Sequence, residues 1–525
     1  MLKLNKTKIK QILDDRFKDD LHKNLSTIPK PHIFKDMNKA AIRIAKAIKN
    51  KEKIAVVGDY DVDGIVSSTI MSEFFANLGV SIKIKIPNRF SDGYGISEEI
   101  VKNLDADLII TVDNGIVAYE AANKCKELGI DLIISDHHTP SDTLPNAYAV
   151  INPKRDDCDF SKHINCEICG AQVAWWLCGA IKKELDIEYN MASFLDLLCI
   201  AIVADMMNLN DLNHILVRCG LKELNKLNRP AFVVLKEKYK KKFFDYESIP
   251  FLIAPLLNAS GRMDDASISY RFLRAKTLDE ARKILEVIEK LNQDRKEQER
   301  QSFEESIEFV SENDSVIIAY SKNWHKGILG IVAGRLAKQF NKPSFVFNIE
   351  ENIAKGSARS VAELDILEVL NNVNDLLINF GGHKGAAGLS LDVSNLEEFK
   401  RRLNKLNFDE NILDFCDTTN TLGELEFSEI DMELLDILGD FEPFGQGNEK
   451  PFFISKNVVI NNLVLLNDKH LKCCFTQNNI TLEAICFNCD FIPFEGDNVN
   501  IHFSLQKNYF KPSPTIQLNI SNIYI

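Results

Sequence analysis

The sequence lacks long apolar runs and a surplus of basic residues. No stretch approaches about 18 uninterrupted apolar residues, and no apolar segment follows the basic first residues as a signal peptide would require. We therefore expect a cytoplasmic protein without membrane contact. Asp and Glu outnumber Lys and Arg by 76 to 63, for a formal net charge of −13. This balance argues mildly against a nucleic-acid binder, because phosphate contacts need Lys and Arg, although one groove can be locally basic.

The sequence also lacks two short motifs of phosphate and ester chemistry. It contains neither the glycine-rich Walker A sequence nor the Gly-x-Ser-x-Gly elbow of α/β-hydrolases. The 12 cysteines are scattered, and the two Cys-x-x-Cys pairs, Cys166/Cys169 and Cys486/Cys489, lie far apart in the chain. A structural zinc site needs four ligands, usually with the second pair nearby. We interpret the cysteines as reduced core residues.

The composition is that of an ordinary globular protein, 26% charged and 45% hydrophobic, and 525 residues suffice for several domains. Between residues 51 and 151, short apolar runs alternate with helical patterns. Continuous apolar runs separated by helices indicate parallel strands in a doubly wound α/β sheet. We predict strands at 54–57, 108–112, 132–134 and 147–151, and helices at 65–78 and 117–128.

The rest of the chain divides into a helical stretch, a second α/β unit and an all-β tail. Residues 170–240 are mostly helical, and a capping-box pattern at Thr277 and Glu280 opens a charged helix that bridges two domains. Alternating residues in the tail are typical of a small antiparallel barrel. In the second unit we predict strands at 316–320 and 344–347, helices at 328–340 and 366–379 and a glycine cluster at 381–388, and in the tail strands at 481–487, 499–505 and 515–525.

The expected domain order has six segments. They are an N-terminal helical lead-in (1–50), an α/β domain with a parallel sheet (51–275), a connecting helix (276–313), a second α/β domain (314–408), a linker segment (409–450) and an OB-like barrel (451–525).

Carboxylates and imidazoles follow three of the predicted strands. Asp59, Asp61 and Asp63 come after the first strand, Asp113 after the second, and the run 136–138, Asp-His-His, after the third. The carboxyl ends of parallel strands meet at one edge, where α/β proteins bind ligands. A single Asp after a strand is usually a helix cap, but three such sets together predict a metal site. Ligands of this kind suit Mn²⁺ or Mg²⁺, and two such ions would support hydrolysis of a phosphate ester or anhydride.

Other candidate residues lie outside this cluster. Asp205 closes a long apolar helical run, where the helix dipole disfavours negative charge, so we expect a compensating cation. Arg89, Arg262 and Arg359 are candidates for holding phosphate, because small residues flank the last two and Arg binds phosphate in a bidentate way. His383, in the glycine cluster, is a fourth. Each Arg could equally form a surface ion pair.

The combined motifs resemble those of the DHH phosphoesterases. The stretches Gly-Asp-Tyr-Asp-Val-Asp-Gly (58–64), Val-Asp-Asn-Gly (112–115), Asp-His-His (136–138) and Val-Ala-Asp (203–205) are similar to the four motifs of that superfamily. The segment 381–388, Gly-Gly-His-Lys-Gly-Ala-Ala-Gly, resembles the associated DHHA1 domain. Within the superfamily the resemblance is to the RecJ family of exonucleases and covers roughly residues 50–525. It rests on segments 86–96, 257–262, 325–331 and 444–448.

This resemblance implies a role for each candidate residue. Asp59 and His138 would act from the edge of the site, and His138 and His383 would contact the scissile phosphate. Arg89, Ser357 and Arg359 would hold the 5′-terminal phosphate, with Arg262 on the neighbouring backbone. The implied metal ligands, with Asp113 bridging two ions, are Asp61, Asp63, Asp113, His137 and Asp205.

The family hydrolyses single-stranded DNA in the 5′→3′ direction and releases 5′-mononucleotides in repair and recombination, so the resemblance implies that activity here. A helicase and a single-strand-binding protein are candidate partners, and we expect a monomer. The tail falls where the family carries an oligonucleotide-binding fold, and residues 507–511, Lys-Asn-Tyr-Phe-Lys, interleave basic and aromatic side chains.

The chain departs from the family's pattern at a few places, which bear on helix packing and on the phosphate pocket. Ala358 and Gln172 each replace a usual glycine, and residues 206–207, Met-Met, replace a more typical small or Pro-containing sequence. Two other functions stay open. One is a phosphodiesterase for oligoribonucleotides or cyclic dinucleotides, or a pyrophosphatase; the other is a DNA-binding accessory protein with a vestigial metal site.

Overall fold

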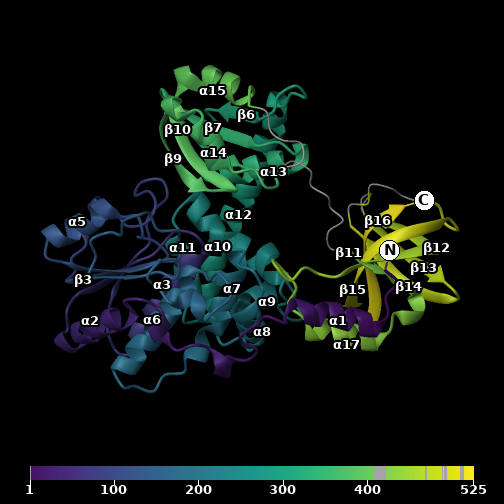
Figure 1. The fold of residues 1–525 in the computed structure, drawn as a ribbon, viewed down its shortest axis with the longest axis horizontal. Helices are drawn as coiled ribbons and strands as arrows, with labels where there is room; N and C mark the ends of the chain where they lie inside the picture. Colours follow the sequence, from purple (N-terminus) through teal and green to yellow (C-terminus); the bar gives the residue numbers. More distant parts are fainter. Residues whose placement is uncertain are drawn as a thin grey trace.

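The computed structural model describes residues 2–406, 421–466, 470–487, 489, 493–508 and 513–524. Two α/β lobes are joined by a long helix, and a barrel lies to one side of them (Figure 1). Each α/β lobe buries an apolar cluster on both faces of its sheet, whereas one cluster fills the barrel. The predicted fold class is therefore confirmed.

The first lobe contains five parallel strands in the order β2-β1-β3-β4-β5. The central strands β1 and β3 are fully buried, as their uninterrupted apolar sequences predict. We did not predict β2, which is short and partly exposed, or the helix α4 (Glu98–Asn103). The strands are β1 (Ile54–Val57), β2 (Lys83–Lys85), β3 (Leu108–Val112), β4 (Asp131–Ser135) and β5 (Ala149–Ile151).

Helices cover both faces of this sheet (Figure 1). The helix α3 (Val62–Asn77) is buried on nearly every side, because α6 and α7 pack against it. It begins three residues before the predicted start, at the point where Asp61 caps it. The other helices of the lobe are α2 (Met37–Asn50), α5 (Tyr119–Glu127), α6 (Gly170–Glu184), α7 (Leu195–Ala204), α8 (Asp211–Leu224), α9 (Pro230–Lys238), α10 (Ala254–Met263) and α11 (Ser267–Leu273).

The connecting helix α12 (Leu278–Ser306) joins the two α/β lobes. Its N-terminus is capped as predicted, since the Thr277 hydroxyl accepts a hydrogen bond from the Glu280 amide at 3.1 Å. The helix packs on α9, α10 and α11 at one end and on α13 at the other. It ends at Ser306 rather than near residue 313. A short 3₁₀ turn, Ile307–Phe309, follows it in place of the last predicted helical turns.

The second lobe has a mixed sheet in the order β6-β7-β8-β10-β9. The predicted helix at 366–379 was wrong in its second half, because α14 ends at Asn371 and residues 377–379 begin the edge strand β9. Pairing with β10 overrides the local helical pattern there. The elements are β6 (Ile317–Ser321), α13 (Leu329–Phe340), β7 (Ser344–Glu350), β8 (Ile353–Arg359), α14 (Ile366–Asn371), β9 (Leu377–His383), β10 (Ala386–Asp392) and α15 (Leu396–Leu403).

The third lobe is a barrel that β12 closes by pairing with both β13 and β15. The N-terminal helix α1 (Lys6–Arg16) lies beside α17 (Met432–Asp440), and Ile9 and Leu13 join the barrel core. The expected lead-in at 1–50 is thus divided, with α1 on the barrel and α2 on the first lobe. The strands are β11 (Thr421–Glu424), β12 (Phe452–Leu466), β13 (His470–Gln477), β14 (Ile480–Cys486), β15 (Asn498–Asn508) and β16 (Thr515–Tyr524).

The segment 441–451, which we call the strap, leads from α17 across the first lobe into the barrel (Figure 1). The Leu209 amide donates to the Gln446 carbonyl at 2.6 Å, so the strap touches the chain just after Asp205. At its start, Arg218 donates to the Asp440 carbonyl at 2.8 Å. No helix in the described ranges combines the length and the apolar character needed to cross a bilayer.

Candidate active site

The acids after β1 lie in one tight turn at the start of α3. The side chains of Asp59 and Asp63 are buried, and Asp61 caps the helix by accepting a hydrogen bond from the Gly64 amide at 3.1 Å. A Cβ at Gly64 would lie 2.5 Å from the backbone of Asp59, which only glycine avoids. The turn therefore holds three carboxylates within a few residues at the strand end.

Asp113 follows β3 in a left-handed backbone conformation, with φ of +63°. This conformation is uncommon for a non-glycine residue and is typical of functional sites. The next residue holds it in place, because the side-chain Nδ2 of Asn114 donates to the backbone carbonyls of Val57 at 3.1 Å and Val112 at 2.9 Å. The buried Asn114 side chain, which is bonded to two strands, thus directs Asp113 toward the edge of the sheet where those strands end.

Asp136 positions the histidines after β4, a role that we did not assign from the sequence. Its Oδ1 accepts from the His137 amide and from His138 Nδ1, both at 2.7 Å, and its Oδ2 accepts from the Ile116 amide at 2.9 Å. Burial alone would lower the pKa of His138, but the hydrogen bond and charge of Asp136 raise it to about 9. The signal available in the sequence was an acid directly before two histidines.

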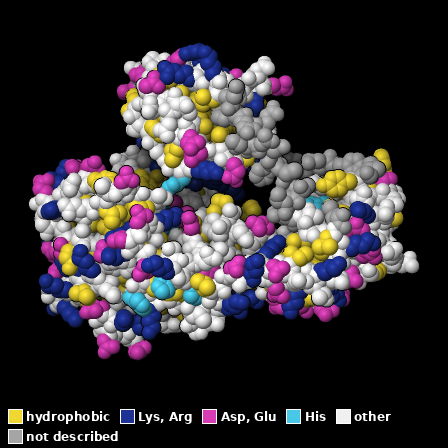
Figure 2. All heavy atoms as spheres, viewed as in Figure 1, with side chains coloured by type: hydrophobic (Ala, Val, Ile, Leu, Met, Phe, Trp, Pro, Cys, Tyr) yellow, Lys and Arg dark blue, Asp and Glu magenta, His cyan; other side chains and the backbone are white. Residues whose placement is uncertain are grey.

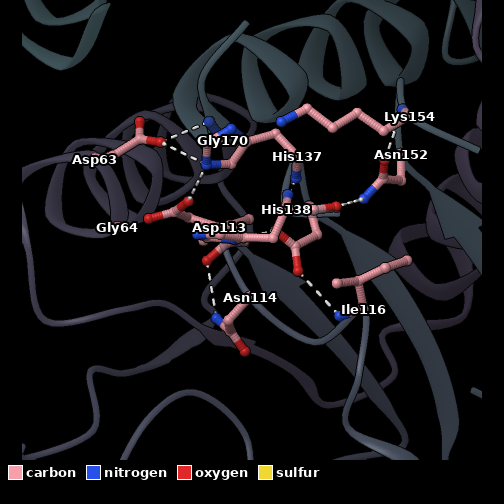
Figure 3. A network of polar contacts seen from close by, with 12 residues as sticks. Asp63, Gly64, Asp113, Asn114, Ile116, His137, His138, Asn152, Lys154 and Gly170 are labelled. Carbon is pink, nitrogen blue, oxygen red and sulfur yellow. Dashed lines mark hydrogen bonds and ion pairs between the residues drawn. The ribbon is translucent and has the colours of Figure 1, made fainter. Parts of the chain in front are cut away.

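The predicted metal ligands converge at the edge of the first sheet (Figure 3). His137 Nε2 lies 3.2 Å from Asp113 Oδ1 and 3.7 Å from both Asp63 Oδ2 and Asp205 Oδ2. Two sets of three side chains each bring ligand atoms within 4.8 Å of one another. One set is Asp63, His137 and Asp205, and the other is Asp59, Asp61 and Asp113.

The carboxylates of this cluster lie close together, so their negative charges repel one another. Burial, and then the charge of neighbouring carboxylates, raises the pKa of Asp59 and Asp113 well above the usual range and that of Asp205 to about 8. Among the described residues, one carboxylate oxygen of each of these acids and Nδ1 of His137 are buried without a hydrogen-bond partner. Divalent cations would neutralise the charge and satisfy the unpaired carboxylate oxygens, and a carboxylate-rich set with one imidazole suits Mn²⁺ or Mg²⁺.

The N-terminus of α6 clamps Asp63, a contact that we did not foresee. The Gly170 amide donates to Asp63 Oδ2 at 2.5 Å (Figure 3), and the Ala171 amide donates to Asp63 Oδ1 at 2.9 Å. A Cβ at Gly170 would lie 2.5 Å from Asp113 Oδ1. Glycine at this position therefore lets the helix start approach two predicted metal ligands at once.

Four of the predicted phosphate-binding residues line one cavity of about 350 Å³ where the two α/β lobes meet, and the remaining candidate, His383, is not in its lining. Lys and Arg side chains border the hollow beneath the second lobe (Figure 2). No acid is among the described residues that line the cavity, although the chain is acidic overall. The four predicted residues are joined there by two tyrosines and two lysines that we did not single out: Arg89, Arg262, Ser357, Arg359, Tyr60, Tyr94, Lys326 and Lys355.

The arginines of this cavity are held by neutral groups. Arg359 donates to the Ser357 hydroxyl at 2.9 Å, and Arg262 donates to the Gly327 carbonyl at 3.3 Å. The Arg89 guanidinium lies 4.1 Å from the centre of the Tyr60 ring. Burial, and then the like charges of nearby arginines, lowers the pKa of Arg262 to about 10. The cavity therefore carries positive charge that an anion would stabilise.

His383 brings the second lobe to the metal centre. It ends β9, and its ring stacks nearly parallel to that of His138, with 6.2 Å between ring centres. Burial, and then the positive charge of His138, lowers the pKa of His383. His383 thus lies beside His138, which belongs to one of the groups of potential metal ligands.

Two other sequence features stand apart from this site. No group of potential metal ligands found among the described residues contains a cysteine. In the basic and aromatic segment 507–511, the Lys507 side chain forms an ion pair with Asp436 at 2.7 Å. Residues 509–511 lie outside the described residues.

Three family models match the chain. They are the DHH family, N-terminal domain, at residues 53–202, the DHHA1 domain at 313–407, and the RecJ OB domain at 423–522. The single-stranded-DNA-specific exonuclease RecJ of Salmonella typhimurium is 33% identical over 518 residues, covering 91% of this chain and 88% of the relative. The protein of the same name from Bacillus subtilis is 33% identical over 495 residues, covering 89% of this chain. This chain spans 60% of that longer relative.

Solved structures show the same architecture. The crystal structure of RecJ in complex with Mn²⁺ from Thermus thermophilus superposes with a TM-score of 0.81 at 25% identity, covering 98% of this chain and 75% of that one. The Mg²⁺ complex from the same organism superposes with a TM-score of 0.77 at 23% identity, covering 98% and 73%. Metal-bound relatives therefore share the fold on which the acid and histidine cluster is built.

Proposed function

The chain belongs to the RecJ family, and on that premise we propose that it is a metal-dependent 5′→3′ exonuclease specific for single-stranded DNA. It hydrolyses phosphodiester bonds and releases 5′-mononucleotides in DNA repair and recombination. The observation that carries the proposal is the pairing of an acid and histidine cluster with an arginine cavity free of acids, on either side of His138 and His383.

The metal centre would hold two divalent ions, Mn²⁺ or Mg²⁺. The residues that would hold them are Asp61, Asp63, Asp113, His137 and Asp205. Asp113 belongs to one set of side chains and lies 3.2 Å from His137 of the other, so it could serve both ions. When bound, such ions supply an activated water and neutralise charge on the reacting phosphate. Asp59 acts from the edge of the centre, where its carboxylate joins the set formed by Asp61 and Asp113.

His138 and His383 contact the scissile phosphate. With a pKa of about 9, His138 stays protonated at neutral pH and can donate a hydrogen bond to a phosphate oxygen. Asp136 holds its ring by Nδ1, which leaves Nε2 free to face the substrate. His383 reaches the same place from the second lobe, so the two lobes together enclose the bond that is cut.

The arginine cavity gives the reaction its direction. Arg89, Ser357 and Arg359 hold the 5′-terminal phosphate, and Arg262 holds the neighbouring backbone. A strand whose 5′ phosphate occupies the cavity presents its first internal phosphate to the histidines. A duplex end would not fit between the lobes, which accounts for selectivity toward single strands.

The protein works on DNA as a monomer in the cytoplasm, in cooperation with a helicase that unwinds duplex and a single-strand-binding protein. The barrel supports this assignment, because OB folds bind single strands through basic grooves and stacking aromatics. It lies beside the first lobe, where the strap fixes it, and can bind DNA that extends beyond the active site.

The direct test compares end-labelled single-stranded and double-stranded DNA, with and without Mn²⁺. We expect mononucleotides from the 5′ end of single strands only, and no product with a chelator. Asp113→Ala should abolish hydrolysis, and Asp113→Asn, which tolerates the left-handed backbone, controls for folding. A variant Asp113→Ala that keeps more than about a tenth of the rate would contradict the role of Asp113. Cleavage of five-nucleotide oligomers but not of long strands would instead favour an oligonucleotide phosphodiesterase.

A further inference from the structure

The clamp on Asp63 depends on where α6 begins. Both Asp63 oxygens accept hydrogen bonds from the first amides of that helix, Gly170 and Ala171. A small rotation of the helix start would lengthen these bonds and move the carboxylate away from His137, which lies 3.7 Å from it. Whatever fixes the first turn of α6 therefore also fixes a predicted metal ligand.

Two buried amide side chains fix that turn. Gln172 Oε1 accepts from the Cys169 amide at 3.0 Å, and Gln172 Nε2 donates to Asn213 Oδ1 at 2.9 Å. Asn213 Nδ2 in turn donates to the Glu167 carbonyl at 2.7 Å. Gln172 and Asn213 are both fully buried. The start of α6 is thus held at residue 169 by Gln172 of the same helix, and at residue 167 by Asn213 of α8.

The same pair reaches the turn that carries Asp205. Asn213 Nδ2 also donates to the Asn208 carbonyl at 3.0 Å. Between Asp205 and Asn208 the chain reverses direction at Met206, whose backbone is left-handed with φ of +54°. Asp63 and Asp205 come from helices far apart in sequence, and Nε2 of His137 lies 3.7 Å from each. One hydrogen-bonded pair therefore sets the position of both carboxylates.

We infer that Gln172 and Asn213 are positioning residues that set the spacing of Asp63 and Asp205 and thereby the affinity of this site for a divalent cation. The inference rests on the metal centre of the proposed function. Both amides lie away from the arginine cavity and outside its lining, so DNA recognition should not depend on them. Residues that orient metal ligands typically change metal affinity when they are replaced.

The test measures Mn²⁺ binding to the metal-free full chain by calorimetry. Gln172→Leu removes both hydrogen bonds of the side chain, and we expect the Mn²⁺ Kd to rise about 10- to 100-fold. The KM for single-stranded DNA at saturating Mn²⁺ should stay within about twofold of the unaltered protein. If Gln172→Leu does not fold, Gln172→Met fills a similar volume with a more flexible side chain and takes its place.

A matched control separates positioning from packing. Asn225 is also an amide of the first lobe, bonded to Phe244 through its side-chain Nδ2 at 2.7 Å and its Oδ1 at 2.8 Å. Asn225→Leu should lower Tm without changing the Mn²⁺ Kd. An unchanged Kd in Gln172→Leu, beside normal binding by the unaltered protein, would overturn the inference alone. Failure of the unaltered protein to bind Mn²⁺ would instead overturn the metal centre of the proposed function.

Discussion

At the scale of single residues, the site depends on side chains that never touch the substrate. Both oxygens of Asp136 accept hydrogen bonds from neighbouring groups, namely three backbone amides and the ring of His138. Asn114 does the same for Asp113 by bonding to two strands. Such partners fix ligand direction and protonation, and their loss typically costs 10- to 100-fold in affinity or activity.

Asp136→Asn should change the pH dependence of hydrolysis. Below its pKa of about 9, His138 is protonated, so activity that needs its proton falls as the pH rises through that value. Without the carboxylate, the pKa of His138 should drop toward the usual histidine range, about 6.5. We expect the alkaline limb of the kcat profile to move to lower pH, measured at saturating Mn²⁺. An alkaline limb that stays in place would show that the proton comes from another group.

Arg359→Ala should weaken the preference for 5′-phosphorylated ends. The guanidinium lines the acid-free cavity beside Ser357, so its loss should raise the KM for phosphorylated strands by roughly tenfold and that for unphosphorylated strands much less. Competition between the two labelled substrates measures this ratio. Arg335→Ala is the matched control, since Arg335 lies on α13 and pairs with Glu299 at the surface. Equal losses on both substrates would contradict a 5′-phosphate pocket.

At the scale of elements, the strand ends collect the ligands and the helix starts hold them. The turns after β1, β3 and β4 supply acids and histidines, α6 directs its first amides at Asp63, and α7 ends at Asp205. The strap then fixes the barrel to the chain that follows Asp205. Asn448 shapes the strap, because its side chain is buried and donates to the carbonyls of Phe441 and Pro443 at 2.9 and 3.0 Å.

Asn448→Ala should loosen the barrel without disturbing the metal centre. Two buried carbonyls would lose their donor, at a cost of about 1–3 kcal/mol to the strap. We expect the rate on long single strands to fall several-fold, while oligomers too short to reach the barrel are cut as before. Asn461→Ala, which removes an amide inside the barrel, is the control. Equal rates on long and short strands would show that the barrel does not guide the substrate.

At the scale of the whole molecule, charge is segregated. The chain has a net charge of −13, yet several buried acids gather at the edge of the first sheet, while the described residues that line the neighbouring cavity are basic or neutral. Clustered acids suit divalent cations and clustered arginines suit phosphate, so the overall sign of the charge does not decide what a protein can bind. Local charge explains why a net acidic protein can act on DNA.

The metal-free protein should become less stable as the pH rises. Asp59, Asp113 and Asp205 have pKa values above the usual carboxyl range, so the folded state holds more protons than the unfolded state. The free energy of unfolding should therefore fall between about pH 4 and about pH 8, the value to which the pKa of Asp205 is raised. Bound Mn²⁺ should prevent most of this loss of stability, because the cation takes the place of the protons on the three carboxylates.

Urea unfolding at pH 6 and pH 8, with a chelator or with Mn²⁺, measures this effect. We expect the chelated protein to lose at least about 2 kcal/mol over this range, the contribution of Asp205 alone, and the Mn²⁺-loaded protein to lose less. Asp205→Asn should flatten the dependence of the chelated protein, because the amide cannot titrate. Identical pH dependence with and without Mn²⁺ would show that these acids do not share a metal site.

The sequence predicted the first sheet well because its central strands are buried on both faces. The apolar runs at 54–57 and 108–112 match β1 and β3. Elements that depend on tertiary pairing were missed or misread: β2 is partly exposed, β8 is rich in small and polar residues, and the second half of the helix predicted at 366–379 includes the start of β9. β2 and β9 are edge strands and β8 lies between β7 and β10, and each takes its conformation from partner strands that local patterns do not encode.

The sequence by itself determined which side chains could form the site, because strand-end acids and histidines must meet where parallel strands end. Only the tertiary structure decided how they are held. The clamp on Asp63, the buried pair Gln172 and Asn213, and the packing of α1 against the barrel all join segments far apart in the chain. Hydrogen bonds and packing between distant segments depend on distances that exist only after the chain has folded.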